Sequence, residues 1–429
     1  MLEVVRRNPD FRRLWIAQVV SQLGDWFSRM AVLAVIGTLG GGAAARGMGT
    51  LFAIELATRL LPTTVLGPLA GPVADRLPRR ALMVSSDLVR AGLVLGLLAV
   101  DEPDELWLLY LLVISQMGIS IFFSAAQSAA LPSTVARDEL HAAYALSAAT
   151  WSAMLSIGAL GGGLLVQRAG TGAVFVLDAL TYVASALLLA GLRLPPVPRH
   201  PEPFRLRDVV FLADLRRGYA HVRACGQVPA ILAKTFWGGA GGFLVLLPIA
   251  ASERFEAGGG GAATAGALGF AVGLFYSARG LGTAIGPLLA RLLHGSSDPA
   301  LRRQITAGFL IGAAGYALFA LAPSLSVAVL CVVFAHAGGS TLWVASTVIW
   351  QKHVDDAFRG RVFALEFLGM TFAFTLGGGL AGTLFDATGS LNAALWTMSI
   401  AVLCLGLLWT ALAGKLTPLS PRRDEAPAP

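Results

Sequence analysis

Apolar segments of about twenty residues, the length of a membrane crossing, follow one another along almost the whole chain. A window of that length delimits twelve candidate spans, at roughly 14–38, 49–73, 81–100, 106–130, 141–166, 172–192, 229–251, 264–290, 304–322, 325–350, 362–385 and 391–413. Charged residues make up 13% of the chain, whereas an ordinary soluble domain carries about a quarter. This leaves too little polar surface to cover a soluble globule. The sequence therefore predicts an all-α membrane protein with twelve transmembrane helices.

The second half of the chain repeats the first at a spacing of 219 residues. The aligned pairs include Gly67 with Gly286, Pro68 with Pro287, Ala145 with Ala364, Gly158 with Gly377 and Gly170 with Gly389. A repeat of this length is a duplicated domain rather than a solenoid unit. We expect two pseudo-symmetric six-helix bundles, residues 1–192 and 229–414, with a substrate path between them.

The longest connection between spans, residues 193–228, divides the two bundles. Within it, Leu212, Leu215, Tyr219 and Val222 follow helical spacing beside several arginines. This pattern predicts a cytoplasmic linker with an amphipathic helix on the anionic inner leaflet, acting either as a tether or as a latch for a gate. Residues 415–429 are expected to form a disordered cytoplasmic tail.

Basic residues gather in alternate loops, which orients the chain. If the N-terminus is cytoplasmic, the outer loops contain only Arg46, Arg168 and Arg254, and most other Lys and Arg residues lie on the inner side. This positive-inside bias predicts a multi-pass protein of the inner or plasma membrane with both termini in the cytoplasm. It also accounts for the net charge of +7, so no nucleic-acid partner is expected.

A charged motif joins the second and third spans, and its members are Gly71, Asp75, Arg76, Arg79 and Arg80. Asp75 falls at the C-terminal end of a helix, where the helix dipole is already negative, so it needs a positive partner. The arginines of the turn or the N-terminus of another helix can supply one. Because such a contact would break when the halves separate, we interpret the motif as a cytoplasmic gate. Glu366, only about 8 Å past Arg361 along its helix, is assigned to the same gate.

With these residues in its second loop, the chain resembles the major facilitator superfamily, whose members carry Gly-x-x-x-Asp-Arg-x-x-Arg-Arg at this place. The segments Ser21–Arg29, Ser86–Ala91 and Phe358–Val362 resemble more narrowly the macrolide-efflux and enterobactin-exporter-like permeases, also called transmembrane secretion effectors. The resemblance implies twelve helices in two bundles, alternating access, and proton-driven export of amphipathic small molecules such as drugs, macrolides or siderophore-like compounds. The chain departs from the pattern at 125–127, where a Pro-Ala-Arg is common, and at 158–159, where Gly-Pro is common.

Charged side chains in the middle of the first two spans form two pairs one helical turn apart, Asp25 with Arg29 and Glu55 with Arg59. A charge at that depth costs roughly 2.5–3.5 kcal/mol, so each must be compensated or functional. Either the four form a structural salt-bridge cluster, or they couple protons and bind substrate. The candidates for proton coupling are Asp25, Glu55 and Asp178. A carboxylate held against an arginine stays ionised, so coupling requires its pairing to change between conformations.

Candidate substrate-cavity residues share a deep position in their spans, and they are Arg29, Arg59, Arg279, Trp26, Trp151, Trp237 and Trp343. Arg279 is the counterpart of Arg59 across the duplication, which suggests contact with a polar or anionic group of the substrate. Core packing is the alternative for the tryptophans. Lys234 is close enough to the inner face to snorkel, and His336 is interpreted as hydrogen-bonded to a neighbour.

Other function classes fit the sequence less well. A membrane-embedded enzyme would need a catalytic motif, and the chain has no Gly-x-Ser-x-Gly, His-Glu-x-x-His, Walker A or Cys-x-x-Cys sequence. No cofactor or metal is expected. A lysophospholipid flippase or an importer of the same fold remains an alternative to the exporter. The expected partners are a small amphipathic substrate, protons and the lipid bilayer, with the monomer as the functional unit because the duplicated halves enclose a path by themselves.

Overall fold

The computed structural model describes residues 2–41, 47–196, 212–254 and 264–414. Within these ranges the chain is helical, without a β-strand. The α-helices are α1 Leu2–Arg7, α2 Pro9–Leu39, α3 Met48–Ala74, α4 Arg79–Gly96, α5 Leu106–Ala130, α6 Leu140–Ala190, α7 Leu212–Ala224, α8 Val228–Gly239, α9 Phe243–Arg254, α10 Ala265–His294, α11 Asp298–Ala320, α12 Leu325–His353, α13 Asp356–Thr388 and α14 Leu391–Ala413. The predicted tail, 415–429, and residues 197–211 of the predicted linker lie outside the described part.

The described helices are long enough for the twelve predicted crossings. Nine helical segments in the described ranges are long and apolar enough to span a membrane. One of them, Arg137–Ala190, provides two crossings because α6 folds back on itself at Gly170. The helices α3 and α11, of 27 and 23 residues, supply the remaining passes. The polar residues of α3 and the three prolines inside it lower its mean hydropathy.

The repeat found in the sequence reappears in the backbone at two glycines. Gly170 reverses the chain within α6 at φ 80° and ψ 168°, and Gly389 ends α13 at φ 60°. These positive φ angles are open to glycine and unfavourable for residues with a Cβ atom. A glycine with a positive φ angle therefore marks the turn between the last two crossings of each half.

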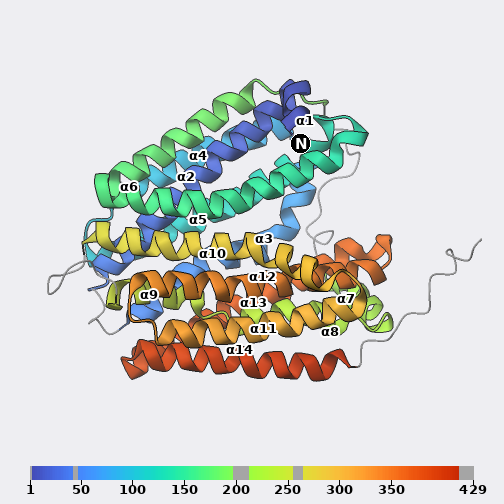
Figure 1. Ribbon diagram of the computed structural model, residues 1–429. Helices are drawn as coiled ribbons and strands as arrows, with labels where there is room; N and C mark the ends of the chain where they lie inside the picture. Colours follow the sequence, from blue (N-terminus) through green and yellow to red (C-terminus); the bar gives the residue numbers. More distant parts are fainter. Residues whose placement is uncertain (1, 42–46, 197–211, 255–263, 415–429) are drawn as a thin grey trace, which may run out of the picture.

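The chain forms two helical halves, α1–α6 and α8–α14, which lie one above the other in Figure 1. Every long helix runs between the same two ends of the molecule. The first, called here the α7 end, carries Asn8, Asp75 and α7, and the second, called here the Asp386 end, carries Gly40, Arg254 and Asp386. The two halves diverge toward the α7 end in Figure 1 and lie close together at the Asp386 end.

Contacts without side chains bring the halves together toward the Asp386 end. A Cβ atom added to Gly49 of α3 would lie 2.1 Å from the carbonyl oxygen of Gly382 in α13. On α6, a Cβ atom added to Gly163 would lie 3.1 Å from the Cα atom of Gly273 in α10. Small residues let helices in membranes approach this closely. Close packing therefore explains part of the glycine-rich stretches in α6 and α13.

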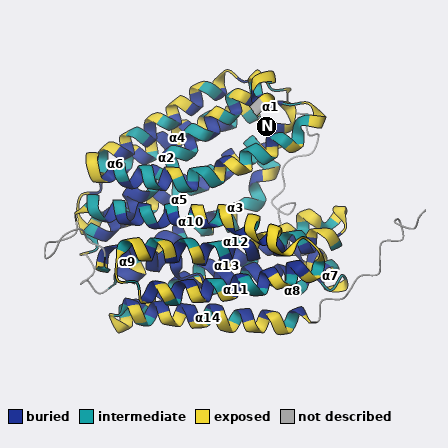
Figure 2. Ribbon diagram, viewed as in Figure 1, coloured by how far each residue is buried: buried dark blue, intermediate teal, exposed yellow. Residues whose placement is uncertain are grey.

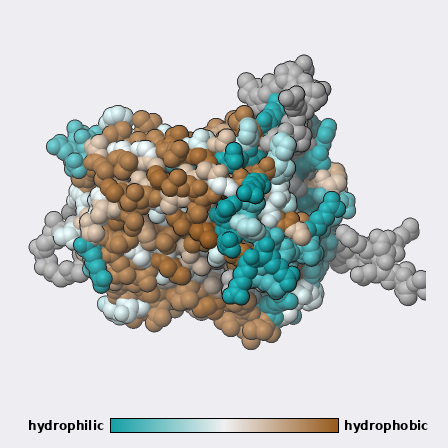
Figure 3. Space-filling model, turned by 90° about the horizontal axis from the view of Figure 1, so that it is seen from above, coloured by the Kyte–Doolittle hydropathy of each residue, from teal (hydrophilic) through white to brown (hydrophobic). Residues whose placement is uncertain are grey.

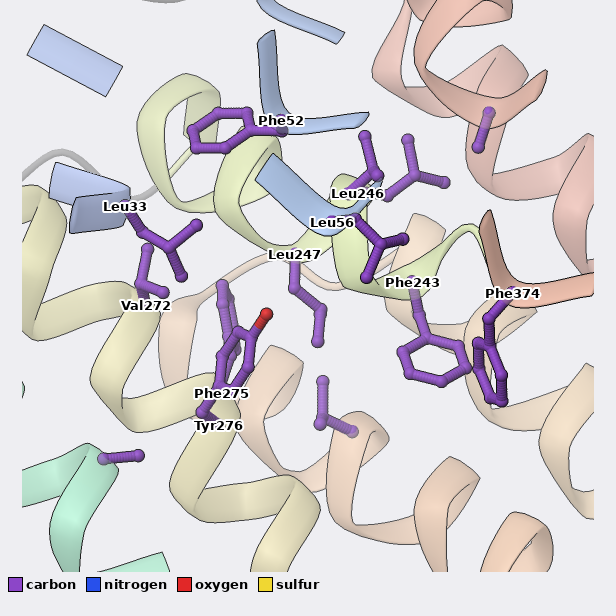
Figure 4. Close-up of a cluster of buried hydrophobic side chains, with 14 of the residues drawn as sticks. Leu33, Phe52, Leu56, Phe243, Leu246, Leu247, Val272, Phe275, Tyr276 and Phe374 are labelled. Atoms are coloured by element: carbon purple, nitrogen blue, oxygen red, sulfur yellow. The ribbon is translucent and has the colours of Figure 1, made fainter. Parts of the chain in front are cut away.

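An apolar core fills the space between these glycine contacts. Figure 4 shows Leu33 of α2 and Phe52 and Leu56 of α3 facing side chains of α9, α10 and α13, and all three are buried. The core thus contains residues from both halves. It holds them together at the Asp386 end while leaving the α7 end apart.

The outer surface of the helices is apolar, in the manner of a protein that faces lipid. Large side chains such as Leu187, Leu292 and Leu293 are 71%, 81% and 76% exposed. Figure 2 shows exposed residues along the outward faces of the peripheral helices, and Figure 3 shows a broad hydrophobic face bordered by hydrophilic residues at the α7 end. Such a surface would be unfavourable in water and suits a bilayer.

The short helix α7 packs on the first turns of α13. The ring of His221 stacks on that of Phe358, with the centroids 4.0 Å apart and the planes 2° from parallel. A Cβ atom added to Gly218 would lie 3.1 Å from the Cβ atom of Arg361. Leu215 and Val222 are buried, so this side of α7 packs on protein, whereas Tyr219 is 45% exposed.

Candidate functional site

A cavity of about 280 Å³ lies in the N-terminal half, on the side toward the α7 end. Its wall comes from α2 to α6 and comprises Gln18, Ser21, Gln22, Asp25, Trp26, Arg29, Arg59, Arg90, Met117, Ser120, Phe123, Ser124, Gln127 and Trp151. Of the predicted cavity residues, Trp26, Arg29, Arg59 and Trp151 line it. Charged, amide and hydroxyl groups thus share one space with two indole rings, which suits a ligand with polar and apolar parts.

Glu55 binds two arginines at the border of this cavity. Arg59, one turn further along α3, donates a hydrogen bond from Nε to Oε1 of Glu55. The Nε atom of Arg29 on α2 lies 4.0 Å from the same oxygen. Because Glu55 is only 1% exposed, the charges of these groups are poorly screened by water.

Asp25 has a partner on another helix and not the predicted Arg29. The hydroxyl group of Tyr182 on α6 donates a hydrogen bond to Oδ1 of Asp25. The side-chain amide of Gln116 on α5 in turn donates to the Tyr182 oxygen at 2.7 Å. Sequence reasoning missed both residues, because only the packing of α2, α5 and α6 brings them to Asp25.

A buried arginine lies beside this network. Arg90 on α4 pairs with Asp87 one turn before it, and both are at most 2% exposed. Its guanidinium carbon lies 4.4 Å from the ring centroid of Tyr182 and 4.5 Å from that of Phe123. Neither residue was among the candidate site residues from the sequence, but the structure places Arg90 on the cavity wall.

Asp178 is fully buried on α6, one turn before Tyr182. Thr181 donates a hydrogen bond to its Oδ1 atom at 3.3 Å, while Oδ2 has no hydrogen-bond partner among the described residues. A Cβ atom added to Gly24 would lie 2.3 Å from that Oδ1 atom, so Asp178 fits directly against α2. Asp25, Asp87 and Asp178 thus bring three carboxyl groups to the region of Arg90.

Arg279 of α10 meets Arg29 across the interface of the two halves. The guanidinium carbons of Arg29 and Arg279 lie 5.0 and 4.8 Å from the ring centroid of Tyr276. Arg29 also donates a hydrogen bond of 3.5 Å to the Tyr276 hydroxyl group. The Nε and Nη1 atoms of Arg279 are buried, without a hydrogen-bond partner in the described part of the chain.

The other two tryptophans lie away from the cavity. Trp237 of α8 is 4% exposed, and Cβ atoms added to Gly312 and Gly339 would lie 2.5 and 2.3 Å from its ring. Trp343 of α12 is 37% exposed, with the Nζ atom of Lys234 4.8 Å from its ring centroid. Core packing accounts for Trp237, and neither residue belongs to the cavity wall of the N-terminal half.

The members of the predicted gate motif, Gly71, Asp75, Arg76, Arg79 and Arg80, lie around the turn after α3 at the α7 end. Asp75 is exposed, and a Cβ atom added to Gly71 would meet nothing within 4 Å. Arg79 and Arg80 donate hydrogen bonds of 2.8 and 3.4 Å to backbone carbonyl groups of their own half.

Glu366 and Lys234 differ from their predicted positions at the inner surface. Both are 3% exposed, and Lys234 donates to Oε2 of Glu366 at 2.9 Å and to Thr347 at 2.6 Å. The indole nitrogen of Trp350 donates to Oε1 of Glu366 at 3.1 Å. The two charges lie inside the C-terminal half because α8, α12 and α13 pack around them, so neither side chain reaches water.

Asp386, which sequence reasoning missed, joins the halves at the end named after it. Its carboxylate, near the end of α13, accepts hydrogen bonds of 2.8 Å from the backbone N–H groups of both Gly49 and Thr50, and one of 2.6 Å from the Thr50 hydroxyl. These N–H groups belong to the first turn of α3, where the helix dipole favours negative charge. Its place near a helix C-terminus, like that of Asp75, was a signal available in the sequence.

Two helical halves with an apolar outer surface, and a cavity with buried charges at its border, are typical of a membrane transporter. The model of the transmembrane secretion effector family matches residues 5–426, and the chain belongs to this family of MFS-type transporters. The predicted superfamily and all-helical fold class are thereby confirmed.

Several relatives cover most of the chain. An uncharacterized MFS-type transporter of Mycobacterium tuberculosis is 29% identical over 378 residues, which is 84% of this chain and 82% of that protein. Macrolide efflux protein A of Streptococcus pyogenes is 23% identical over 88% of this chain and 90% of its own length. A putative bacilysin exporter of Bacillus subtilis is 27% identical over 35% of this chain and 37% of its own.

Solved transporters share the fold. A POT family transporter in complex with 5-aminolevulinic acid aligns with a TM-score of 0.71 at 14% identity, over 97% of this chain and all of that one. A bacterial homolog of the human lysosomal transporter Spinster, in an inward-facing and unoccupied conformation, aligns with a TM-score of 0.69 at 13% identity, over 94% and 98% of the two chains.

The buried Lys234–Glu366 pair yields a stability prediction. Glu366→Gln leaves a buried ammonium group without its counter-charge, which should cost about 3–5 kcal/mol. We expect a clear drop in the thermal unfolding midpoint of the purified protein in detergent, largely reversed by the double change Lys234→Met with Glu366→Gln. Asp356→Asn, an exposed change on the same helix, is the control and should alter stability little. An unchanged midpoint for Glu366→Gln alone would contradict the structural role.

Proposed function

We propose that this protein is a proton-coupled exporter of an amphipathic small molecule that works as a monomer by alternating access. In this proposal residues 1–192 and 229–414 move as two units connected by the linker 193–228. The observation that carries the proposal is the asymmetric contact between the halves, tight at the Asp386 end and open toward the α7 end, beside a cavity of mixed polarity. The names of two relatives, a macrolide efflux protein and a putative bacilysin exporter, support export.

We place the α7 end in the cytoplasm. The basic residues of the gate motif and of α7 lie there, and the acidic segment 101–105 lies at the opposite end, as the positive-inside rule requires. In this orientation the cavity, which lies toward the α7 end, would receive its cargo from the cytoplasm. Loading from this side suits an exporter.

We propose that α3 and α13 alternate between two reciprocal caps. At the Asp386 end, the carboxylate near the end of α13 caps the start of α3. At the α7 end, Asp75 follows the end of α3, and α13 of the other half begins at the same end of the molecule with Asp356. Approach of the halves at the α7 end would let Asp75 cap the start of α13, while Asp386 releases α3.

We assign proton coupling to Asp25 and Asp178 rather than to Glu55. Glu55 is held by Arg59 and faces Arg29, so two cations already compensate its charge. Asp25 is bound by a neutral phenol, and the partner of Asp178 is a threonine hydroxyl. With Asp25, Asp87 and Asp178 gathered near the single guanidinium of Arg90, a bound proton would relieve the repulsion among them.

The coupling assignment predicts the behaviour of Asp178→Asn. The substitution breaks no ion pair, so the protein should fold, but transport of fluorescent amphipathic dyes in proteoliposomes should no longer respond to a proton gradient. Asp104→Asn, an exposed carboxylate, is the control and should leave the response intact. A full gradient response in folded Asp178→Asn protein would exclude this residue as the carrier, and movement of labelled lysolipid instead of dyes would favour a flippase.

The reciprocal caps predict opposite effects of two substitutions. Asp386→Asn removes the charge that caps α3 and should favour closure of the α7 end by about tenfold, because such a cap contributes about 1–2 kcal/mol. Asp75→Asn should favour the open arrangement. Distances between spin labels at positions 77 and 294, measured in a background without the three native cysteines, report the two populations. Identical distance distributions in both variants would refute the mechanism.

The orientation predicts which loops react with an impermeant maleimide in intact cells. Asp104→Cys should be labelled from outside, and Leu77→Cys, an exposed position beside Asp75, should be protected until the cells are permeabilised. The reverse pattern would invert the topology and would turn the proposed exporter into an importer.

A further inference from the structure

Three arginines meet where the cavity borders the C-terminal half, and their charges are only partly compensated. Arg29 and Arg59 share the single carboxylate of Glu55, since both form their ion pair with its Oε1 atom. Arg279 has no ion pair within the described residues, and its Nε and Nη1 atoms are buried without a hydrogen-bond partner. The Nε atom of Arg29 is likewise buried without a hydrogen bond.

Aromatic rings hold two of these cations in place. The guanidinium of Arg29 lies 5.4 Å from the ring centroid of Trp26 and 5.0 Å from that of Tyr276. That of Arg279 lies 4.8 Å from Tyr276 and 5.3 Å from Phe243. Cation–π contacts orient a guanidinium but leave its N–H donors free, so they do not replace an anion. Both groups are thus oriented to donate to a ligand.

The two cations come from different halves. Arg29 lies on α2 and lines the cavity, while Arg279 lies on α10, across the interface. Trp26 and Tyr276, one from each half, have their ring centroids 6.1 Å apart. An anion bound between the arginines would therefore contact both of the units that move relative to each other.

We infer, on the basis of the proposed transport function, that the cargo is an anionic amphiphile. Its carboxylate, sulfonate or phosphate group is bound by Arg29 and Arg279. Arg59 contributes less, because Glu55 already neutralises it. The apolar body of the cargo lies against Trp26 and Trp151. Hydroxyl and amide groups of α2 and α5, and the carboxyl group of Asp25, make up the polar part of the cavity wall. A neutral or cationic drug would leave the surplus positive charge uncompensated in a region of low dielectric.

Binding of matched fluorescent probes to the full chain tests this assignment. The protein is placed in nanodiscs of zwitterionic phosphatidylcholine, and energy transfer from tryptophan to the dansyl group is followed, with protein-free discs subtracted. Dansylate carries a permanent sulfonate charge, and dansylamide is its neutral counterpart. We expect dansylate to bind at least about tenfold more tightly, because hydrogen bonds to a charged group are stronger than those to a neutral one.

Variants separate a specific anion site from general loss of structure. Arg29→Gln and Arg279→Gln should each weaken dansylate binding about tenfold and leave dansylamide binding unchanged, whereas Arg29→Lys should retain part of the preference. Arg168→Gln, an exposed arginine near the Asp386 end, is the matched control without effect. Equal affinity for the two probes, or parallel weakening of both in the arginine variants, would overturn the inference.

Additional competition and transport experiments identify the source of the anion and separate this inference from the proposed function. Competition by lysophosphatidylglycerol would assign the site to a lipid headgroup, and lack of competition to a soluble anion, both in support of an anion site. Gradient-driven transport of a naphthyl trimethylammonium dye without any preference for dansylate would overturn the anionic cargo but leave the exporter standing. Arginine-dependent binding of dansylate without any response to a proton gradient would support the site and reject proton-coupled export.

Discussion

A charged side chain inside a bilayer must be paired with an opposite charge or be neutralised. This constraint determines how the N-terminal half is arranged. Glu55 finds its counter-charges on α3 and α2, and Asp25 finds a phenol on α6. Each of these contacts except the one-turn pair with Arg59 ties one helix to another. The buried charges therefore fix how the helices of this half are rotated as well as where the cavity lies.

The buried charges are also segregated by sign. Carboxyl groups gather around Arg90 within the N-terminal half, while arginines gather around Glu55 at the border with the C-terminal half. Asp25 and Arg29, one turn apart on α2, stand between the two groups and both line the cavity. An anion would neutralise an arginine, and a carboxyl group would lose a proton, on neighbouring turns of the same helix. This proximity gives a short physical route for coupling cargo binding to proton release.

Local features of the sequence predicted the fold well. Hydropathy delimits each crossing because the length of an apolar run is a property of one segment, and glycines at 170 and 389 mark the turn that both halves repeat. The Glu55–Arg59 contact was also readable, since it joins residues one turn apart. Trp26 and Trp151 line the cavity, as their deep positions in their spans predicted.

Features that depend on packing between distant segments were not readable. Helical spacing suggested that Asp25 binds Arg29, but α6 brings the hydroxyl group of Tyr182 to Asp25. Depth along a single helix placed Glu366 and Lys234 near water, yet α8 and α13 turn these residues toward each other. Trp237 occupies a notch formed by glycines of two other helices.

Asp386 shows how one electrostatic rule can operate at both ends of the same helix pair. A carboxylate at a helix C-terminus is unfavourable on its own helix and favourable at the N-terminus of an antiparallel neighbour. Asp386 satisfies this rule on α3, and Asp75, which directly follows the end of α3, is proposed to do the same on α13. Because α3 and α13 are close enough at the Asp386 end for their glycines to touch, they cannot be equally close at the α7 end while the halves are splayed. In the proposed mechanism only one of the two caps forms at a time, and a rocking motion about the interface would exchange one for the other at little net electrostatic cost.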